Sequence, residues 1–188
     1  MPLSEYRRER RSGPHLGPRG RLGRKRRGSD SGALFVIHHH TAGGDHYDLR
    51  LEIDGVLASW AISSDPSTNP RDRRMAHRAE DHPLEFATFE GEIPDGELDA
   101  GGVIVWDRGT YANGTQRAMG EGLARGHLSF RLHGEKLGGG FTRIREGRDE
   151  TWLLIKRNDE AADPRRKVVQ TRPESVRSGP TSDDLDEA

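Results

Sequence analysis

The chain has 188 residues, of which 32% are charged and 31% hydrophobic, a length and composition that predict one modest globular domain rather than two. It contains no cysteine, which excludes disulfides and zinc–thiolate sites, so any metal must be bound by His, Asp, Glu or Asn. No apolar run approaches the roughly 18 residues of a membrane span, and no apolar segment follows the basic N-terminus as in a signal peptide. A soluble, cytoplasmic protein without membrane contacts is therefore expected.

The overall charge of −1 conceals a basic N-terminal segment. Residues 1–29 contain ten Lys or Arg and two acidic residues, and Gly and Pro separate the basic clusters. Such a segment cannot bury a core, so residues 1–30 are predicted to form a disordered basic arm. The arm would neutralise several phosphates and give nucleic acid a salt-sensitive affinity, with a solubilising tail as the equal alternative.

The middle of the chain reads as strands separated by Gly-containing turns. The first apolar run covers residues 34–37. In residues 46–62, Asp54 and Gly55 lie between two apolar-rich runs and predict a tight hairpin turn. Further strands are expected at residues 86–93, 103–107, 127–132, 141–145 and 152–156, and short helices at residues 71–80 and 114–125.

Many short strands favour a closed or partly closed barrel, or a sandwich, over an α/β sheet. We expect a mainly β protein, a compact β barrel with one or two short helices and disordered termini. The barrel domain would cover residues 31–160. Residues 161–188 mix Pro, Arg, Ser and Asp without periodicity and are predicted to be a flexible tail.

The strongest chemical signal lies in the strand that begins at His46. Because alternate side chains of a strand share a face, His46, Asp48, Arg50 and Glu52 project to one side, and the apolar residues between them project to the core. His40 can complete a set of three ligands for a divalent metal with open positions, such as Mn²⁺, Fe²⁺ or Zn²⁺. The guanidinium of Arg50 would then bind an oxyanion beside the metal. An ordinary solvated strand face is the alternative.

Two further histidine motifs bear on this site. In the run His38 to His40, strand alternation turns His39 away from its neighbours, which favours His40 as the ligand. In the segment 80–83, Pro83 favours an extended backbone at His82 and aims that side chain out of a loop. Beside a metal site, His82 could donate a proton to a leaving oxygen, whereas alone it would be an ordinary surface residue.

An ordered series of motifs resembles the 3′-phosphoesterase domain of bacterial DNA ligase D, from about Phe35 to Asn158. The matching segments are residues 35–37 with His40, 46–52, 54–61, 80–84, 89–94 and 103–110. The resemblance implies a compact β barrel and a Mn²⁺-favoured removal of a 3′-terminal ribonucleoside and then of the 3′ phosphate. The product would be a 3′ hydroxyl for repair synthesis and ligation.

The resemblance also implies roles for individual residues. The metal ligands would be His40, His46 and Asp48, and the phosphate would be bound by Arg50, Arg74 and His82, with His82 also a possible general acid. Glu80 matches an acidic position that the family needs, and it would orient a neighbouring group. The cofactor would be Mn²⁺, with Zn²⁺ or Co²⁺ as alternatives.

The sequence departs from the family pattern at several positions. Ser64 and Phe86 stand where relatives commonly have Lys and Tyr, Gly44-Asp45 replaces an Arg-Leu pair, and His38 and His39 replace Gln and Lys. The balance between diesterase and monoesterase steps is therefore open.

The resemblance implies partners as well. The substrates would be 3′ ends of primer–template DNA or RNA–DNA. No ligase or polymerase region is visible, so a stand-alone form is implied, with separate end-joining ligase, polymerase and Ku proteins as partners. Its expected location is the nucleoid. Two alternatives remain. One is a non-haem Fe(II) oxygenase-like barrel enzyme, which uses the same ligand pattern. The other is a catalytically weakened, nucleic-acid-binding accessory module of end joining.

Overall fold

The computed structural model describes residues 32–41, 45–94, 101–147, 150–179 and 181, so the expected basic arm lies outside the described residues. The described strands are β1 (Ala33–His40), β2 (His46–Ile53), β3 (Val56–Ile62), β4 (Arg73–His82), β5 (Gly91–Ile93), β6 (Gly101–Asn113), β7 (His127–Gly134), β8 (Gly138–Arg145) and β9 (Thr151–Lys156). The helices are the 3₁₀ helix η1 (Leu84–Thr88), α2 (Met119–Arg125) and α3 (Val168–Thr171). None of these helices is long and apolar enough to cross a bilayer.

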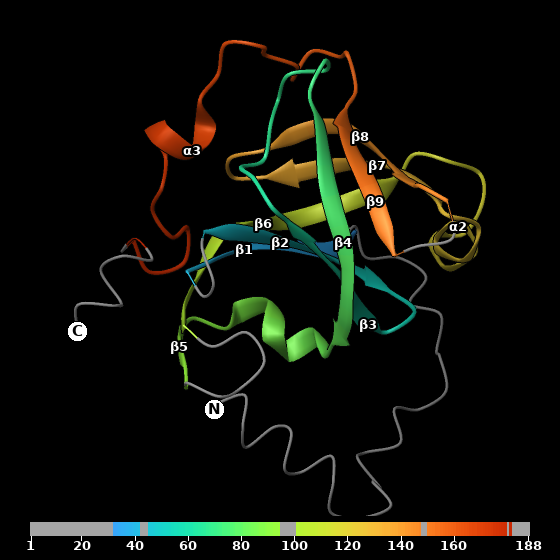
Figure 1. Cartoon of the computed structure of the whole chain (residues 1–188). Coiled ribbons are helices and arrows are strands. Elements are labelled where there is room, and N and C mark those ends of the chain that lie inside the picture. The colour runs from blue at the N-terminus through green and yellow to red at the C-terminus, as the bar shows by residue number, and fades with distance from the viewer. Residues whose placement is uncertain (1–31, 42–44, 95–100, 148–149, 180, 182–188) are drawn as a thin grey trace, which may run out of the picture.

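The strands form one antiparallel sheet that closes on itself. Its order is β1-β2-β3-β4-β9-β8-β7-β6-β5, and β1 also pairs with β6. This pairing closes an eight-stranded barrel, and β5 continues the sheet beyond β6 (Figure 1). The expected mainly β barrel with short helices is confirmed.

The hairpin between β2 and β3 has the turn that its sequence predicts. Asp54 and Gly55 both have positive φ angles, 51° and 83°, as a two-residue hairpin turn requires. The turn fixes the register, so that Ile53 pairs with Val56 and, further along, Arg50 pairs with Ser59. The turn itself therefore sets which side chains of β2 and β3 lie opposite one another across the hairpin.

Apolar side chains gather on both sides of the barrel wall. The interior is filled from alternate positions of the strands, and it includes the fully buried Trp60, Trp106 and Trp152. A smaller second cluster lies on the outer face and joins β1, β3 and β6 to the segment of η1 and β5; its buried members are Val36, Leu57, Phe86, Ile93, Val103 and Val105. The outer face of the barrel is thus covered where η1 and β5 cross it.

One buried cation has no polar partner within the part of the chain that the structure describes. Arg143 in β8 has no exposed surface, and none of its guanidinium nitrogens has a hydrogen-bond partner among the described residues. Its guanidinium carbon lies 4.3 Å from the centroid of the Trp60 ring. Burial, and then the charge of Arg78, hold the pKa of Arg143 well below its ordinary value. The stacking on Trp60 offsets only part of the cost of burying a charge.

We expect Arg143→Met to increase the free energy of unfolding by roughly 1–3 kcal/mol, because an apolar side chain of similar length replaces a buried, unpaired charge. Urea denaturation measures the change. Arg145→Met, two residues along β8, is the matched control, and it should change stability by less than about 0.5 kcal/mol. A loss of stability in Arg143→Met would contradict the prediction and would show that the guanidinium is compensated in the folded protein.

The helix expected at residues 71–80 is wrong, because this segment is strand β4. Arg73 to His77 pair with β9, and Ala76 to His82 pair with β3. The sequence contains residues that favour helices, but β4 pairs with β3 on one side and with β9 on the other, and so keeps the sheet continuous. Tertiary pairing overrides local propensity here.

Two other expected elements differ in extent. The first part of the strand expected at residues 86–93 belongs instead to the 3₁₀ helix η1, in which the Phe86 amide donates to the Pro83 carbonyl, and Gly91–Ile93 forms strand β5. Pro83 starts the tight turn because its φ is already helix-like. The helix expected at residues 114–125 is confirmed only for Met119–Arg125, and it ends at Gly126 in the left-handed conformation.

The segment expected to be a flexible tail packs on the barrel over residues 161–179. Val168 is buried in the interior cluster, and the Trp106 indole N–H donates to the Arg172 carbonyl at 2.9 Å. Lys136 also donates to the carbonyls of Arg172 and Glu174. The sequence has no periodicity here because few side chains are buried, and the contacts are made mainly by the backbone.

Candidate functional site

The candidate residues meet on the outer face of the barrel, where β1 and β2 are paired. In this register His40 lies opposite His46, and His38 lies opposite Asp48. His39, between them, stacks on the Tyr47 ring with a centroid separation of 4.5 Å, as strand alternation predicts. The pairing of two neighbouring strands thus brings residues together that are distant in sequence.

His40, His46 and Asp48 offer a compact set of metal-ligating atoms. One nitrogen of each histidine and one oxygen of the carboxylate all lie within 4.8 Å of one another. His40 and Asp48 are buried, whereas the His46 side chain is 23% exposed. The cluster is therefore open toward solvent at His46 and closed behind it.

Asp48 is held in its ionised form. Burial opposes the charge of this carboxyl and would raise its pKa. This effect is outweighed by the hydrogen-bond contact with His46 and by the charges of Arg50, His46 and His40, which lower the pKa to about 2. The His46 Nε2 atom lies 3.6 Å and the Arg50 Nη2 atom 3.3 Å from Asp48 Oδ2. A carboxylate that stays charged at neutral pH is ready to bind a cation.

The three residues fit a divalent metal. Imidazole and carboxylate ligands bind such ions at about 2.0–2.2 Å, so two ligand atoms of one ion are at most about 4.4 Å apart. The ligand atoms lie within 4.8 Å of one another, so the side chains would draw together when they bind one ion. Two imidazoles and one carboxylate are also a donor set that borderline metals accept while keeping positions for water or substrate.

Arg50 is the centre of a polar network beside this cluster. Its side chain is buried, and its three guanidinium nitrogens have different partners. Nε donates to His38 Nδ1 at 3.1 Å, Nη1 to Ser59 Oγ at 2.8 Å, and Nη2 to Asp48 Oδ2 at 3.3 Å. The Phe86 ring lies 4.9 Å from the guanidinium carbon. A guanidinium held on several sides presents its donors in a fixed direction.

His38 has a defined tautomer. Its Nε2 atom lies 3.2 Å from the Phe89 carbonyl, which can only accept, so Nε2 carries the proton. Nδ1 is then free to accept from Arg50. Burial, and then the charge of Arg50, lower the pKa of His38 well below its ordinary value, which keeps the ring neutral. A neutral His38 can therefore orient Arg50 without adding a second positive charge.

His82 can take two tautomers, and they differ in what they offer to a substrate. Its Nδ1 atom lies 2.8 Å from the Glu80 carbonyl and 3.1 Å from Arg50 Nη1. A carbonyl only accepts and a guanidinium only donates, so one neutral tautomer satisfies one contact at a time. When Nδ1 accepts from Arg50, Nε2 carries the proton that a leaving oxygen would need.

Glu80 and Arg74 lie differently from the other candidates. The Glu80 side chain is exposed, and its backbone carbonyl is what contacts His82. Arg74 donates to the Asp65 carbonyl and lies 3.5 Å from the Asp65 carboxylate and 3.4 Å from that of Asp72. Its described contacts are with these groups and not with the His and Asp cluster.

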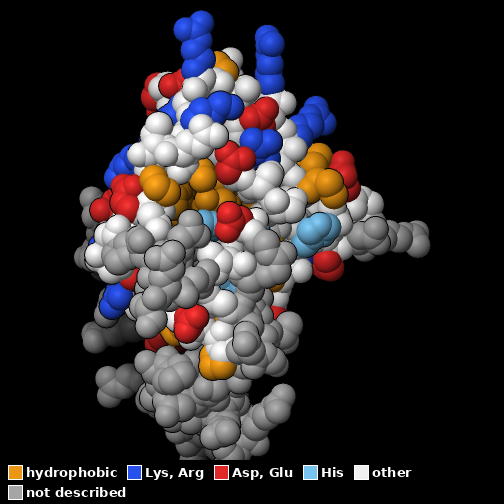
Figure 2. Space-filling view, turned by 60° about the vertical axis from the view of Figure 1, so that its left-hand side comes forward, with side chains coloured by type: hydrophobic (Ala, Val, Ile, Leu, Met, Phe, Trp, Pro, Cys, Tyr) orange, Lys and Arg blue, Asp and Glu red, His pale blue; other side chains and the backbone are white. Residues whose placement is uncertain are grey.

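Arg74 belongs to an end of the barrel that carries several basic side chains. Figure 2 shows Lys and Arg side chains gathered at the upper end of the molecule. In Figure 1 the loop after β3 and the chain after β9 lie at this end. These two loops are joined by hydrogen bonds between Thr68 and Asp163. Arg74 would have to exchange Asp65 and Asp72 for a phosphate in order to contact substrate.

Ser59 and His38 are members of the network that sequence reasoning did not assign to the site. Both could have been found from strand pairing, because a two-residue turn at Asp54 and Gly55 sets Ser59 opposite Arg50. Strand alternation likewise sets His38 on the face of His40. Phe86, noted for lacking a hydroxyl, packs against the His38 and His82 rings at 5.0 and 4.7 Å.

Comparisons with known proteins agree on one family. Residues 38–145 match the family described as the DNA Ligase D 3′-phosphoesterase domain. The chain is 44% identical over 183 residues to the multifunctional non-homologous end joining protein LigD of Pseudomonas aeruginosa, covering 94% of this chain and 21% of that protein. It is 45% identical over 122 residues to the corresponding LigD protein of Mycobacterium tuberculosis, covering 65% and 16%. For LigD of Mycolicibacterium smegmatis the identity is 38% over 130 residues, covering 67% and 17%. The chain thus spans about a fifth or less of the length of these relatives.

Proposed function

The chain belongs to the DNA ligase D 3′-phosphoesterase domain family, and on this premise we propose that it is a metal-dependent phosphoesterase of DNA 3′ ends. It removes a 3′-terminal ribonucleoside, a 3′ phosphate or both, and leaves a 3′ hydroxyl for repair. The observation that carries the proposal is the cluster of His40, His46 and Asp48, with ligand atoms within 4.8 Å, directly beside the guanidinium of Arg50. The expected phosphoesterase domain of residues 31–160 is extended in this proposal to residue 179, because residues 161–179 pack on the barrel.

The proposed cofactor is Mn²⁺, held by His40, His46 and Asp48, and Zn²⁺ or Co²⁺ would suit the same donors. When bound, such an ion would polarise a phosphoryl oxygen and favour the attack of water. The Asp48 carboxylate lies with the two imidazoles in one compact group of ligand atoms, which supports a cation site.

The side chains around the proposed metal position have complementary roles. Arg50 binds the phosphate and stabilises the negative charge that grows on it during the reaction, because its donors are already oriented. His82 binds a phosphoryl oxygen or donates a proton from Nε2 to the leaving oxygen. Ser59 and His38 hold Arg50 in place. Glu80 supports His82 through its backbone carbonyl, and Arg74 contacts the nucleic acid backbone only after it leaves Asp65 and Asp72.

We propose that the substrates are DNA ends, as primer–template DNA or RNA–DNA. The named relatives are non-homologous end joining proteins, which supports this choice and supports separate ligase, polymerase or Ku proteins as partners. The protein would then act in the cytoplasm, at the nucleoid.

Product analysis on a DNA primer with one 3′ ribonucleotide tests the proposal. With Mn²⁺ we expect a shortened primer with a 3′ phosphate, followed by one with a 3′ hydroxyl, and no turnover when the metal is chelated. A parallel incubation with Fe²⁺ and 2-oxoglutarate tests the oxygenase alternative. Binding of the primer without either reaction would refute the enzyme and favour an accessory module.

A further inference from the structure

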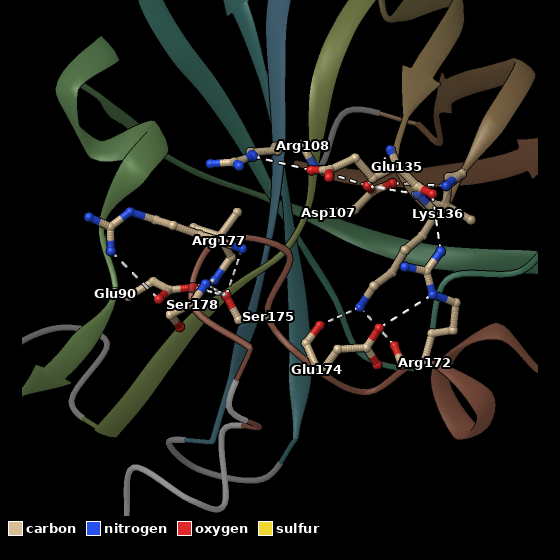
Figure 3. A network of polar contacts seen from close by, with 12 residues as sticks. Glu90, Asp107, Arg108, Glu135, Lys136, Arg172, Glu174, Ser175, Arg177 and Ser178 are labelled. Atoms are coloured by element: carbon tan, nitrogen blue, oxygen red, sulfur yellow. Dashed lines mark hydrogen bonds and ion pairs between the residues drawn. The ribbon is translucent and has the colours of Figure 1, made fainter.

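The C-terminal segment from residue 168 to residue 179, here called the C-terminal strap, lies across β6 next to the candidate site. It is attached to the barrel at two places, by Lys136 near Arg172 and by Glu90 at Ser175 (Figure 3). Lys136 and the Trp106 indole donate to its carbonyls near Arg172, and the Val176 amide donates to the Val105 carbonyl at 2.9 Å. The strap is therefore part of the folded domain on the side of the barrel where β6 pairs with β1.

Glu90 joins the strap to β6. One oxygen of its buried carboxylate accepts from the Val105 amide at 2.9 Å and from the Ser175 hydroxyl. Ser175 Oγ in turn accepts from the amides of Arg177 and Ser178, both at 3.0 Å, which folds the strap around this contact (Figure 3). Hydrogen bonds to a charged carboxylate are stronger than hydrogen bonds to a neutral acceptor. Glu90 is thus fixed from two sides.

The residue before Glu90 contacts the site directly. The Phe89 carbonyl accepts from His38 Nε2, and His38 Nδ1 accepts from Arg50 Nε. Phe89 also stacks on Phe86 at 5.0 Å, and the Phe86 ring covers the Arg50 guanidinium. A displacement of the backbone at residues 89 and 90 would therefore move both the hydrogen-bond partner and the ring cover of Arg50.

We propose that Glu90 and Ser175 are positioning residues, through which the C-terminal strap sets the direction of the Arg50 guanidinium. The proposal rests on the proposed function, in which Arg50 binds the phosphate. The path runs from Ser175 to Glu90, along the backbone to Phe89, and through the His38 ring to Arg50. Neither Glu90 nor Ser175 touches the substrate, and their effect is transmitted by the position of one carbonyl.

A structural readout tests the positioning without any substrate or metal. In ¹⁵N NMR spectra, the Arg50 Nε–H resonance and its coupling across the hydrogen bond to His38 Nδ1 report the guanidinium position. Ser175→Ala and Glu90→Ala should shift this resonance and weaken the coupling, whereas Glu90→Gln, which keeps an acceptor oxygen, should restore both. Glu174→Ala is the matched control, because it lies in the same strap and its carboxylate pairs with the partly exposed Arg172.

Steady-state kinetics on a 3′-phosphorylated primer provides the second readout. We expect Ser175→Ala and Glu90→Ala to lower kcat by about 10-fold with a smaller change in KM, since a misoriented group loses mainly transition-state contacts. Wild-type kcat and an unmoved Arg50 resonance in Ser175→Ala would overturn the proposal. Ser175→Ala removes a single oxygen atom, so it remains informative if Glu90→Ala does not fold. An inactive wild-type protein would instead refute the proposed function, while the NMR comparison would still decide the positioning.

Discussion

Replacing His46 with alanine should abolish phosphoesterase activity, by about 10³-fold or more, and should remove Mn²⁺ binding, while the barrel stays folded. The proposed metal site supplies several kcal/mol of transition-state stabilisation, which corresponds to this loss in rate. The His46 side chain is partly exposed on the outer face, away from the interior cluster, so its truncation should cost less than about 1 kcal/mol of stability. Calorimetric titration with Mn²⁺, kinetics on a 3′-phosphorylated primer and urea denaturation measure the three quantities.

His133→Ala is the matched control for this variant. His133 is an exposed histidine of β7, so its removal should leave activity, metal binding and stability at their wild-type levels. A fully active His46→Ala protein would overturn the assignment of the metal site. Loss of activity together with loss of the fold would show that His46 has a structural role that its position on the outer face does not predict.

The largest effect on stability is expected for Asp107→Ala. The Asp107 carboxylate is buried and accepts four backbone amides, those of Arg108, Glu135, Lys136 and Leu137, at 2.9–3.0 Å (Figure 3). These bonds attach the turn between β7 and β8 to β6. Truncation leaves the donors without an acceptor, so we expect the free energy of unfolding to fall by roughly 3–4 kcal/mol in urea denaturation.

The pH dependence of this effect has a definite sign. Burial raises the pKa of Asp107 above 3.8, and the four amide bonds hold back part of the rise. The pKa of Asp107 is higher in the folded protein than in the unfolded chain. The stability linked to this group is therefore fully present at a pH below the unfolded pKa, and it is lost as the pH rises through the folded pKa. The advantage of the wild type over Asp107→Ala should therefore be larger at pH 4 than at pH 7.

Glu135→Ala is the control for Asp107→Ala. The Glu135 carboxylate lies beside the same turn, and it pairs with the exposed Arg108 side chain at 3.2 Å. Its loss should cost less than about 1 kcal/mol and should show no comparable pH dependence. A similar cost for both variants would mean that the amide contacts of Asp107 are not what holds the turn.

The parts of the fold that could be predicted are those that depend on local chemistry. Asp54 and Gly55 are residues that tolerate positive φ, so the turn and the register of β2 and β3 follow from the sequence. The alternation of β2 likewise predicts which side chains lie on the site face. These inferences need no knowledge of the rest of the chain.

The parts that failed depend on distant partners. Residues 73–80 favour a helix by composition, but β9, more than 70 residues later, pairs with them and makes them a strand. The strap has little apolar periodicity, and it packs because Lys136 and Trp106 offer donors to its carbonyls. In the candidate site, too, local features could be predicted and contacts between distant segments could not. Strand alternation and one flanking histidine predict the candidate ligands, whereas the contact from Phe89 to His38 depends on how the segment of η1 and β5 packs on the barrel.

The alternation along β2 also limits how this domain can change by insertion and deletion. Tyr47, Leu49 and Leu51 fill the interior, and the residues between them lie on the face of the candidate site. Adding or removing one residue within the strand would exchange the two sets, placing charged groups in the interior and apolar ones on the face of the candidate site. Such a change would damage stability and chemistry at once. Changes in chain length in related sequences should therefore fall in the turns and loops, while β2 keeps its length.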